Sequence, residues 1–179
     1  MLERFIREYS QRAFQFAYRL CGNTEQAKEL VQEAFVRVIC KWDQYDLSQS
    51  LENWFLTILR NVYYDNLKRF ERRSSISLDS PCGDEDESMT LAETIADPNE
   101  PSLLVRLERE EAKAEVREVL ESLSPEYKAI LALCDMQALS YEQIAAVLDC
   151  PLGTVRSRLC RARTAFKKKF LEKIKGVKP

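Results

Sequence analysis

Residues 140–163 read SYEQIAAVLDCPLGTVRSRLCRAR, two short helical patterns that meet at a tight break. Ser140 can cap a helix with its hydroxyl, and Gln143 three residues later completes a capping box. The sequence therefore predicts a first helix over about 141–148. The apolar positions of this helix that should face a neighbour are Ile144, Ala145 and Leu148.

The break between the two patterns predicts a turn. Pro151 has no amide hydrogen and disfavours helix in the residue before it. Gly153 tolerates backbone angles that other residues avoid. From about Thr154, apolar residues recur three or four positions apart and predict a second helix with one buried stripe. That stripe is formed by Val155, Leu159, Ala162 and Phe166. Two helices joined in this way are typical of a helix-turn-helix.

The rest of the second helix is polar and basic, which points to DNA. Between residues 150 and 179 there are ten Lys or Arg side chains and one acidic side chain. Arginine can pair with two acceptors on a guanine edge or with phosphate oxygens. A basic helix face can also be only a solvated surface, but this local charge excess favours nucleic acid. The candidate DNA contacts are Thr154, Arg156, Ser157, Arg158, Cys160, Arg161 and Arg163.

The composition of the whole chain narrows the class of protein. Its 179 residues are 45% apolar and 31% charged, as in ordinary soluble proteins. No apolar run approaches the ~20 residues that span a bilayer, and the start of the chain is not a signal peptide. We therefore expect a cytoplasmic protein with no direct membrane insertion.

The sequence offers no enzyme site. It has six cysteines without a C-x-x-C pair, and it has no histidine. Metal binding and a disulfide framework are therefore not expected. There is also no Gly-rich phosphate loop and no G-x-S-x-G elbow. We predict neither a cofactor nor a catalytic residue.

Charge divides the chain into three parts. Residues 74–102 carry eight acidic side chains and no basic one, whereas residues 1–73 and 103–179 each have a basic excess. The middle part is also rich in Ser, Pro and Asp and lacks a sustained period, which predicts a flexible acidic linker. The acidic run 84–87 is either solvated or a mimic of nucleic acid. We expect an all-α protein of two small helical domains joined by this linker.

The first domain has the patterns of three helices. Asn23 with Gln26 predicts the cap of the second helix near Thr24, and 43–50 is a polar loop before the third. The predicted buried positions of the first helix are Leu2, Phe5, Ile6, Tyr9, Ala13, Phe16, Ala17 and Leu20. Those of the second are Ala27, Leu30, Val31, Ala34, Phe35, Val38 and Ile39, and those of the third are Trp54, Ile58, Leu59 and Val62.

The third helix mixes aromatic and cationic side chains. Bases stack on aromatic rings for about 1–3 kcal/mol each while cations follow the phosphates, so this mixture suits single-stranded DNA. For Trp54 and Phe55 a place in the core is the more frequent outcome. For the basic end, residues 68–73, we favour the nucleic-acid role.

Together these features resemble the bacterial RNA polymerase sigma factors, specifically the small two-domain extracytoplasmic-function (ECF) group. The first domain carries the resemblance in ELVQEAFVRV at 29–38 and in WFLTILRNVYYDNLKR at 54–69. The second carries it in LSPEYKAILAL at 123–133 and in LSYEQIAAVLDCPLGTVRSRLCRAR at 139–163. The resemblance covers essentially the whole chain, and the last motif is very specific.

The resemblance implies a role for each part of the chain. The second helix would dock on the clamp helices of the largest polymerase subunit, and the flap region would hold the second domain. The implied polymerase contacts are Leu30, Val31, Gln32, Glu33 and Phe35. The loop 42–50 would capture a flipped base of the −10 element, and Asn61 matches the strand-separation position. The implied −10 residues are Tyr45, Asn61, Tyr64, Lys68, Arg69, Arg72 and Arg73.

In the second domain the resemblance places the recognition helix in the major groove of the −35 element. Arg156, Ser157, Cys160 and Arg161 stand at the contact positions of the family. Related proteins often carry a bulkier side chain at Cys160, and the stretch around Lys28 is usually acidic. The resemblance also implies an anti-sigma factor as a further partner.

The distance between the promoter elements sets a condition on the linker. Elements centred about 25 base pairs apart are ~85 Å apart, at ~3.4 Å per pair. A flexible coil of the linker's length averages about 30 Å end to end and reaches roughly 100 Å when extended. The linker must therefore be well extended in the complex.

Two other classes of function remain as alternatives. A stand-alone helix-turn-helix regulator would bind palindromic duplex DNA as a dimer. The chain has no obvious dimerisation heptad, and the chemistry between Asn61 and Arg73 would then have no purpose. An enzyme that acts on nucleic acid would need a catalytic constellation that the sequence lacks.

Overall fold

The computed structural model of the chain describes residues 2–74 and 103–176, and every regular element in these ranges is helical. The all-α expectation is thus confirmed. The expected acidic linker, 74–102, lies outside the described residues except for its first position. The elements are α1 (Leu2–Cys21), α2 (Thr24–Cys40), the short 3-10 helix η1 (Trp42–Gln44), α3 (Leu51–Ser74), α4 (Leu103–Glu121), α5 (Pro125–Leu131), the π-helical turn η2 (Ala132–Met136), α6 (Tyr141–Leu148) and α7 (Leu152–Gly176).

The N-terminal half is a bundle of α1, α2 and α3 around a shared apolar core. Gly22 ends α1 with a φ of 74°, a left-handed angle that suits glycine. The Asn23 side chain accepts a hydrogen bond of 3.0 Å from the Gln26 amide and caps α2, as predicted. The largest fully buried side chains here are Phe16, Leu20, Val38, Phe55 and Leu59.

The C-terminal half packs α5, α6 and α7 together. The predicted capping box is confirmed: the Gln143 amide donates to Ser140 Oγ, and Gln143 Oε1 accepts from the Ser140 amide. The core of this half is formed by Ile130, Leu133, Ile144, Val147, Val155, Leu159 and Ala162. Val147 takes the place of the predicted Ala145 and Leu148, which are only half-buried.

The turn of the helix-turn-helix differs from the prediction. The left-handed residue is Asp149, with a φ of 49°, and not Gly153. Because Pro151 suits the position just before a helix, α7 already begins at Leu152, and Gly153 lies in its first turn. An aspartate tolerates the left-handed conformation better than most residues, so the turn needs no glycine.

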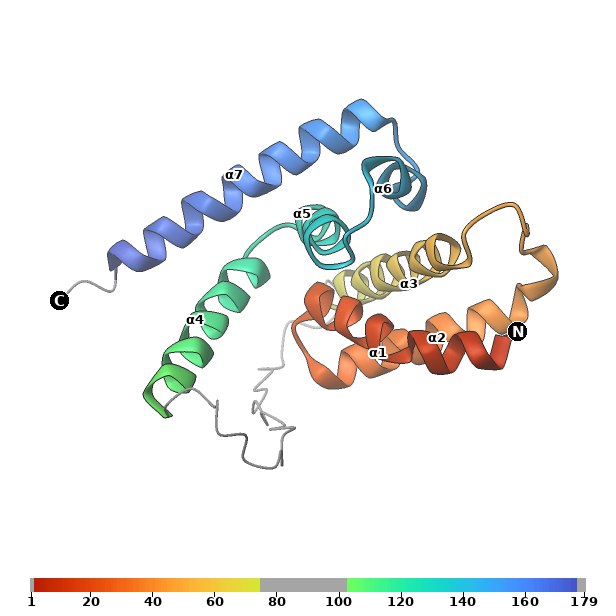
Figure 1. Cartoon of the computed structure of the whole chain (residues 1–179), viewed down its shortest axis with the longest axis horizontal. Coiled ribbons are helices and arrows are strands. Elements are labelled where there is room, and N and C mark those ends of the chain that lie inside the picture. Colours follow the sequence, from red (N-terminus) through yellow and green to blue (C-terminus); the bar gives the residue numbers. More distant parts are fainter. Residues whose placement is uncertain (1, 75–102, 177–179) are drawn as a thin grey trace.

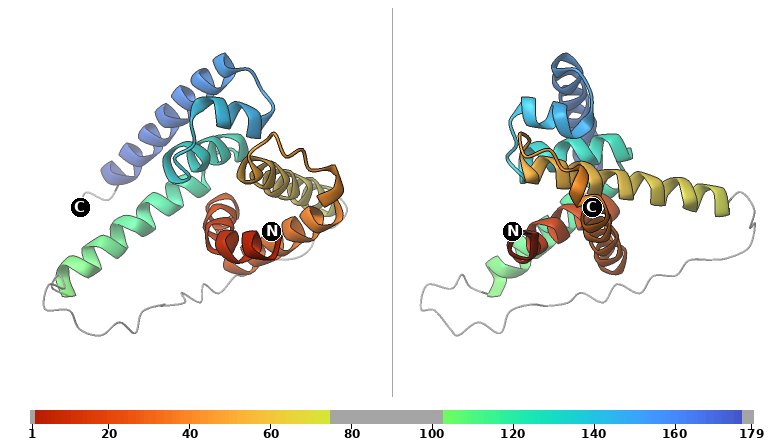
Figure 2. Two further views of the ribbon diagram at one scale, coloured as in Figure 1. Left: turned by 45° about the vertical axis from the view of Figure 1, so that its right-hand side comes forward. Right: turned by 90° about the vertical axis from the view of Figure 1, so that its right-hand side faces the viewer.

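The two halves are in contact (Figure 1). In Figure 1, α3 lies between α2 and α6. Figure 2 shows the two halves in contact from two further directions. α3 packs against α6, and α1 packs against α4, α5 and η2. The guanidinium of Arg117 in α4 lies 5.4 Å from the ring centroid of Tyr18 in α1. Within the described ranges, no helix is both long and apolar enough to cross a membrane.

Candidate nucleic-acid interface

The exposed face of α7 is fixed by the buried stripe on its other side. Val155, Leu159 and Ala162 are at most 2% exposed, so they hold the helix in one orientation. The predicted base-reading residues on the opposite side, Arg156, Ser157, Cys160 and Arg161, are all exposed. The structure therefore brings these four together on one helical face, as the spacing predicts.

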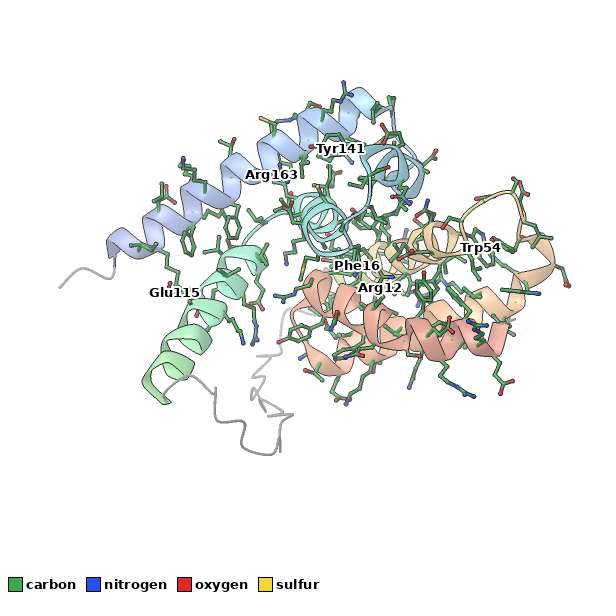
Figure 3. The ribbon with its side chains drawn as sticks, viewed as in Figure 1. Arg12, Phe16, Trp54, Glu115, Tyr141 and Arg163 are labelled. Atoms are coloured by element: carbon green, nitrogen blue, oxygen red, sulfur yellow. The ribbon has the colours of Figure 1, made fainter. Side chains whose placement is uncertain are left out.

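A shallow groove of about 320 Å³ borders this face where α6 and α7 meet. Figure 3 labels Tyr141 and Arg163, two of its lining residues. Arg163 Nη2 donates to Asp135 Oδ1 at 2.5 Å, and this carboxylate raises the pKa of Arg163. Arg156 and Cys160 line the same groove. Arg163 thus remains half-exposed beside the recognition face, with one carboxylate already bound.

Arg158 and Thr154 do not belong to the open part of the face. Arg158 Nε lies 3.7 Å from Glu126 Oε2 of α5, and its side chain is only 26% exposed. Arg158 is therefore turned toward α5 in the free chain, and its predicted contact with DNA stays a prediction. Thr154 is half-buried, and its carbonyl accepts a hydrogen bond from Ser157 Oγ at 3.1 Å.

Three aromatic rings gather at the start of α3. The Tyr45 ring centroid lies 5.7 Å from that of Trp42 and 4.9 Å from that of Trp54. All three side chains are half-buried, so their rings remain partly open to solvent. Trp54 is labelled in Figure 3 near the loop that enters α3. The expected core position holds for Phe55, which is fully buried, but not for Trp54.

The loop that carries Tyr45 is held by its own hydrogen bonds. Tyr45 Oη donates to the Gln49 carbonyl at 2.7 Å. The Ser48 amide donates to Asp46 Oδ1 at 2.9 Å, and this bond lowers the pKa of Asp46. Between them Leu47 is 79% exposed. Trp42 is the first residue of the loop 42–50, to which the resemblance assigns base capture, and its ring adds to the cluster beside the predicted −10 residue Tyr45.

Farther along α3, the predicted −10 residues Asn61 and Tyr64 are neighbours of Arg60. Arg60 Nε and Nη2 donate to Asn61 Oδ1 at 3.1 and 2.6 Å. The Arg60 guanidinium lies 6.0 Å from the Tyr64 ring centroid. Asn61 is exposed, whereas Tyr64 is half-buried, and this burial raises its pKa.

The last turns of α3 present the predicted cations to solvent. Lys68, Arg69 and Arg72 are exposed, and Phe70 between them is 63% exposed. The side chain of Arg73 lies outside the described residues. This end of α3 therefore offers both charge and one aromatic ring.

The predicted polymerase contacts on α2 divide into two groups. Leu30 and Val31 are only 2% and 8% exposed, because they pack in the core of the N-terminal bundle. Their predicted contact with the polymerase stays a prediction, and in the free chain they mainly position the exposed neighbours on α2. Gln32 and Glu33 are exposed, and Phe35 is half-buried with its ring 4.9 Å from that of Phe55.

Two apolar residues extend this α2 surface and were not predicted as contacts. Val36 is 56% exposed and Ile39 is 53% exposed. Ile39 was expected in the core, but the helix turns it outward at the end of α2. Exposed apolar side chains beside polar ones are typical of a protein–protein contact surface. The helical spacing alone did not show that these two side chains are exposed.

The described residues show no metal centre. No group of three or more His, Cys, Asp or Glu side chains among them could hold a metal ion. The five cysteines in the described ranges, at 21, 40, 134, 150 and 160, are free thiols.

Comparison with known proteins identifies both halves. Residues 5–73 match sigma-70 region 2, and residues 113–166 match sigma-70 region 4. The ECF RNA polymerase sigma factor SigE of Mycolicibacterium smegmatis is 37% identical over 161 residues, 90% of this chain. The chain spans 58% of the length of that relative. The ECF RNA polymerase sigma factor EcfG of Rhodopseudomonas palustris is 32% identical over 83% of this chain and 74% of its own.

A solved structure has the same fold. It is the sigma factor RpoE of Bartonella quintana in complex with the anti-sigma factor NepR. The TM-score is 0.71 at 24% identity, over 95% of this chain and 96% of that chain. With a region 2 bundle, a region 4 helix-turn-helix and relatives above 30% identity, the chain belongs to the ECF family of bacterial RNA polymerase sigma factors.

Proposed function

We propose that this chain is a dissociable initiation subunit that directs bacterial core RNA polymerase to promoters with defined −10 and −35 elements. It acts in the cytoplasm with the polymerase and performs no chemistry itself. The main support for the proposal is that this one chain carries two separate surfaces suited to DNA. One is the exposed face of α7, and the other is the aromatic and basic side of α3 with its loop.

The α7 face serves the −35 element. Arg156 and Arg161 are exposed on a rigidly oriented helix, and such a helix fits the major groove of duplex DNA. Ser157 and Cys160 between them reach the same base edges. Arg163, beside the groove, is placed to contact the phosphate backbone.

The α3 side serves the −10 element after the strands separate. A flipped base costs a few kcal/mol to unstack, and aromatic partners return about 1–3 kcal/mol each. The cluster of Trp42, Tyr45 and Trp54 provides such partners beside Asn61. Lys68, Arg69, Arg72 and Arg73 bind the phosphates of the upstream duplex.

The exposed side of α2 binds the clamp helices of the largest polymerase subunit. With Leu30 and Val31 in the core, the contact consists of Gln32, Glu33 and Phe35, extended by Val36 and Ile39. The flap region holds the C-terminal half. An anti-sigma factor, as found in the Bartonella quintana complex, is a partner that would compete for such surfaces.

The experiment is transcription from genomic DNA by bacterial core polymerase with and without this chain, followed by mapping of the transcript starts. We expect new starts only when the chain is present, each preceded by a common pair of motifs. The spacing between the motifs should be constant, because one protein reads both.

The same experiment separates this function from a dimeric regulator. A stand-alone helix-turn-helix dimer would bind a palindrome without polymerase and would create no new starts with core enzyme alone. Failure of the chain to bind core polymerase would contradict the proposal directly.

A further inference from the structure

The recognition helix α7 continues beyond the part of the chain that matches sigma-70 region 4. That match ends at residue 166, whereas α7 runs to Gly176. We call residues 167–176 the α7 extension. Its first eight residues, KKKFLEKI, contain four lysines and a single acidic residue, Glu172. A basic helical segment of this kind fits a negatively charged partner.

One side of the α7 extension is held against α4 (Figure 1). Lys169 Nζ donates to the Ser122 carbonyl, just after α4, at 2.5 Å. Lys173 forms an ion pair with Glu118 of α4. Lys169 and Lys173 follow the buried Ala162 by seven and eleven residues, so all three lie on one helical stripe. These contacts fix which side of the α7 extension faces away from α4.

Lys167 and Lys168 occupy the other side of the α7 extension, and both are exposed. Lys167 follows Arg156 by eleven residues and Cys160 by seven, and both intervals are close to whole helical turns. Lys168 follows Arg161 by seven residues in the same way. The two lysines therefore extend the exposed face of α7 that carries the proposed −35 contacts.

Both lysines are available for a partner. Within the part of the chain that the structure describes, Lys167 has no acidic partner. Lys168 Nζ lies 3.9 Å from Glu172 Oε1, and the two side chains are 76% and 63% exposed. An ion pair this long and this exposed contributes little to stability, so a phosphate can replace the carboxylate. Lysine ammonium groups bind phosphates as point charges.

The distance along α7 favours the DNA backbone, rather than base edges, as the target of these lysines. Lys167 lies ~16 Å beyond Arg156 along the helix axis, at ~1.5 Å per residue. The major groove of duplex DNA is ~12 Å wide. A helix that reads bases through Arg156 therefore carries Lys167 and Lys168 past the base edges, to the level of the phosphates that border the groove.

We propose that Lys167 and Lys168 bind the phosphate backbone that borders the −35 element, and that the α7 extension thereby strengthens promoter binding without reading sequence. This inference rests on the proposed function, since it takes Arg156 and Arg161 to read the −35 element. Each phosphate contact adds about 0.9 to the salt dependence of binding, which is the slope of log K against log salt concentration. Contacts of this class position a protein on duplex DNA and carry no base specificity.

The test measures the binding of the polymerase complex to promoter fragments over a range of salt concentrations. Lys167→Gln and Lys168→Gln keep a polar side chain but remove its charge. The matched control is Lys169→Gln, which removes one charge from the same helix on the side that faces α4. Each variant is measured on a promoter with the correct −35 element and on one with a single-base change in that element.

Each of the first two substitutions should lower the magnitude of the salt slope by about 0.9. At ~0.15 M salt this corresponds to roughly fivefold weaker binding, equal on both promoters. Lys169→Gln should keep the wild-type slope. Wild-type slopes for Lys167→Gln and Lys168→Gln would overturn the inference. An equal fall for Lys169→Gln would overturn it as well, because the overall charge of the helix would then explain all three results.

A second measurement does not depend on charge. A photo-crosslinking amino acid at position 167 or 168 should attach to DNA beside the −35 element, outside the bases whose change weakens binding. The same group at position 169 should not reach DNA, since that side of α7 faces α4. The absence of DNA crosslinks from both 167 and 168 in a promoter-bound polymerase complex would contradict the inference.

Failure of the proposed function gives a different result. If the polymerase complex binds no promoter, the proposed function is wrong, and the salt slopes are then measured for the free chain on duplex DNA of random sequence. Phosphate contacts need no particular sequence, so Lys167→Gln and Lys168→Gln should still lower the slope there. Unchanged slopes on that duplex would show that these lysines do not contact the backbone.

Discussion

Single side chains join helices that lie far apart in the sequence. Arg37 is an example: its Nε binds Glu33 one turn earlier in α2, and its Nη1 binds Asp65 of α3, each at 2.9 Å. These two bonds fix the α2 surface next to the α3 surface. The carboxylates raise the pKa of Arg37, with Asp65 the largest cause.

Tyr63 gives a prediction for stability at high pH. Its burial raises its pKa from 10.0 to about 12. Below pH 10, Tyr63 is neutral in both the folded and the unfolded chain, so its ionisation does not lower the free energy of unfolding. Between pH 10 and 12 the unfolded chain ionises while the folded chain does not, so the free energy of unfolding falls. We expect a loss of about 1 kcal/mol between pH 9 and 11 relative to Tyr63→Phe, measured by urea denaturation. Parallel pH profiles for the two proteins would contradict this.

Two glycines should respond to alanine in opposite directions. Gly153 lies in the first turn of α7, with no atom within 4 Å of an added Cβ. Gly153→Ala should therefore raise the free energy of unfolding by about 0.5–1 kcal/mol.

Gly22 has a φ of 74°, and its added Cβ would lie 2.6 Å from Glu121 Oε1. Gly22→Ala should lower the free energy of unfolding by roughly 1–2 kcal/mol in the same denaturation assay. A higher free energy of unfolding for both variants would contradict the left-handed turn at Gly22 between α1 and α2.

At the scale of elements, local rules explain what the sequence could predict. The capping residues Asn23 and Ser140 mark helix starts because their side chains bond amides three residues away, within the same segment. Sequence spacing also places Arg156 and Arg161 on one face. It does not show that Leu30 and Val31 are buried, because a resemblance assigns a role to a whole motif, whereas burial depends on how α2 packs in the bundle.

The α7 face predicts a contrast between two arginines of one helix. Arg161→Ala should cost about 1–3 kcal/mol of discrimination between the correct −35 element and a single-base change, if the side chain reads that base. Arg158→Ala should leave this discrimination unchanged, because Arg158 faces Glu126. Competition binding of the polymerase complex to promoter fragments measures both. An equal loss for Arg161→Ala on every sequence would mark that residue as a phosphate contact.

At the scale of the whole molecule, the sequence could predict two helical regions but not how they pack. Arg60 binds a backbone carbonyl 87 residues away, and no pattern of side chains identifies such a partner. The aromatic cluster could not be predicted for the same reason. The rings of Trp42 and Trp54 come together only after the loop between α2 and α3 folds back. Long-range contacts of this kind depend on the three-dimensional path of the chain.

The most direct test of the account is a footprint of the polymerase complex on one of its promoters. Hydroxyl-radical cleavage reports the −35 contact, and permanganate reports unpaired thymines near the −10 element. We predict that both signals appear together, only with core polymerase and this chain present. Protection of a palindrome by the chain alone, without any permanganate-reactive thymine, would contradict the account.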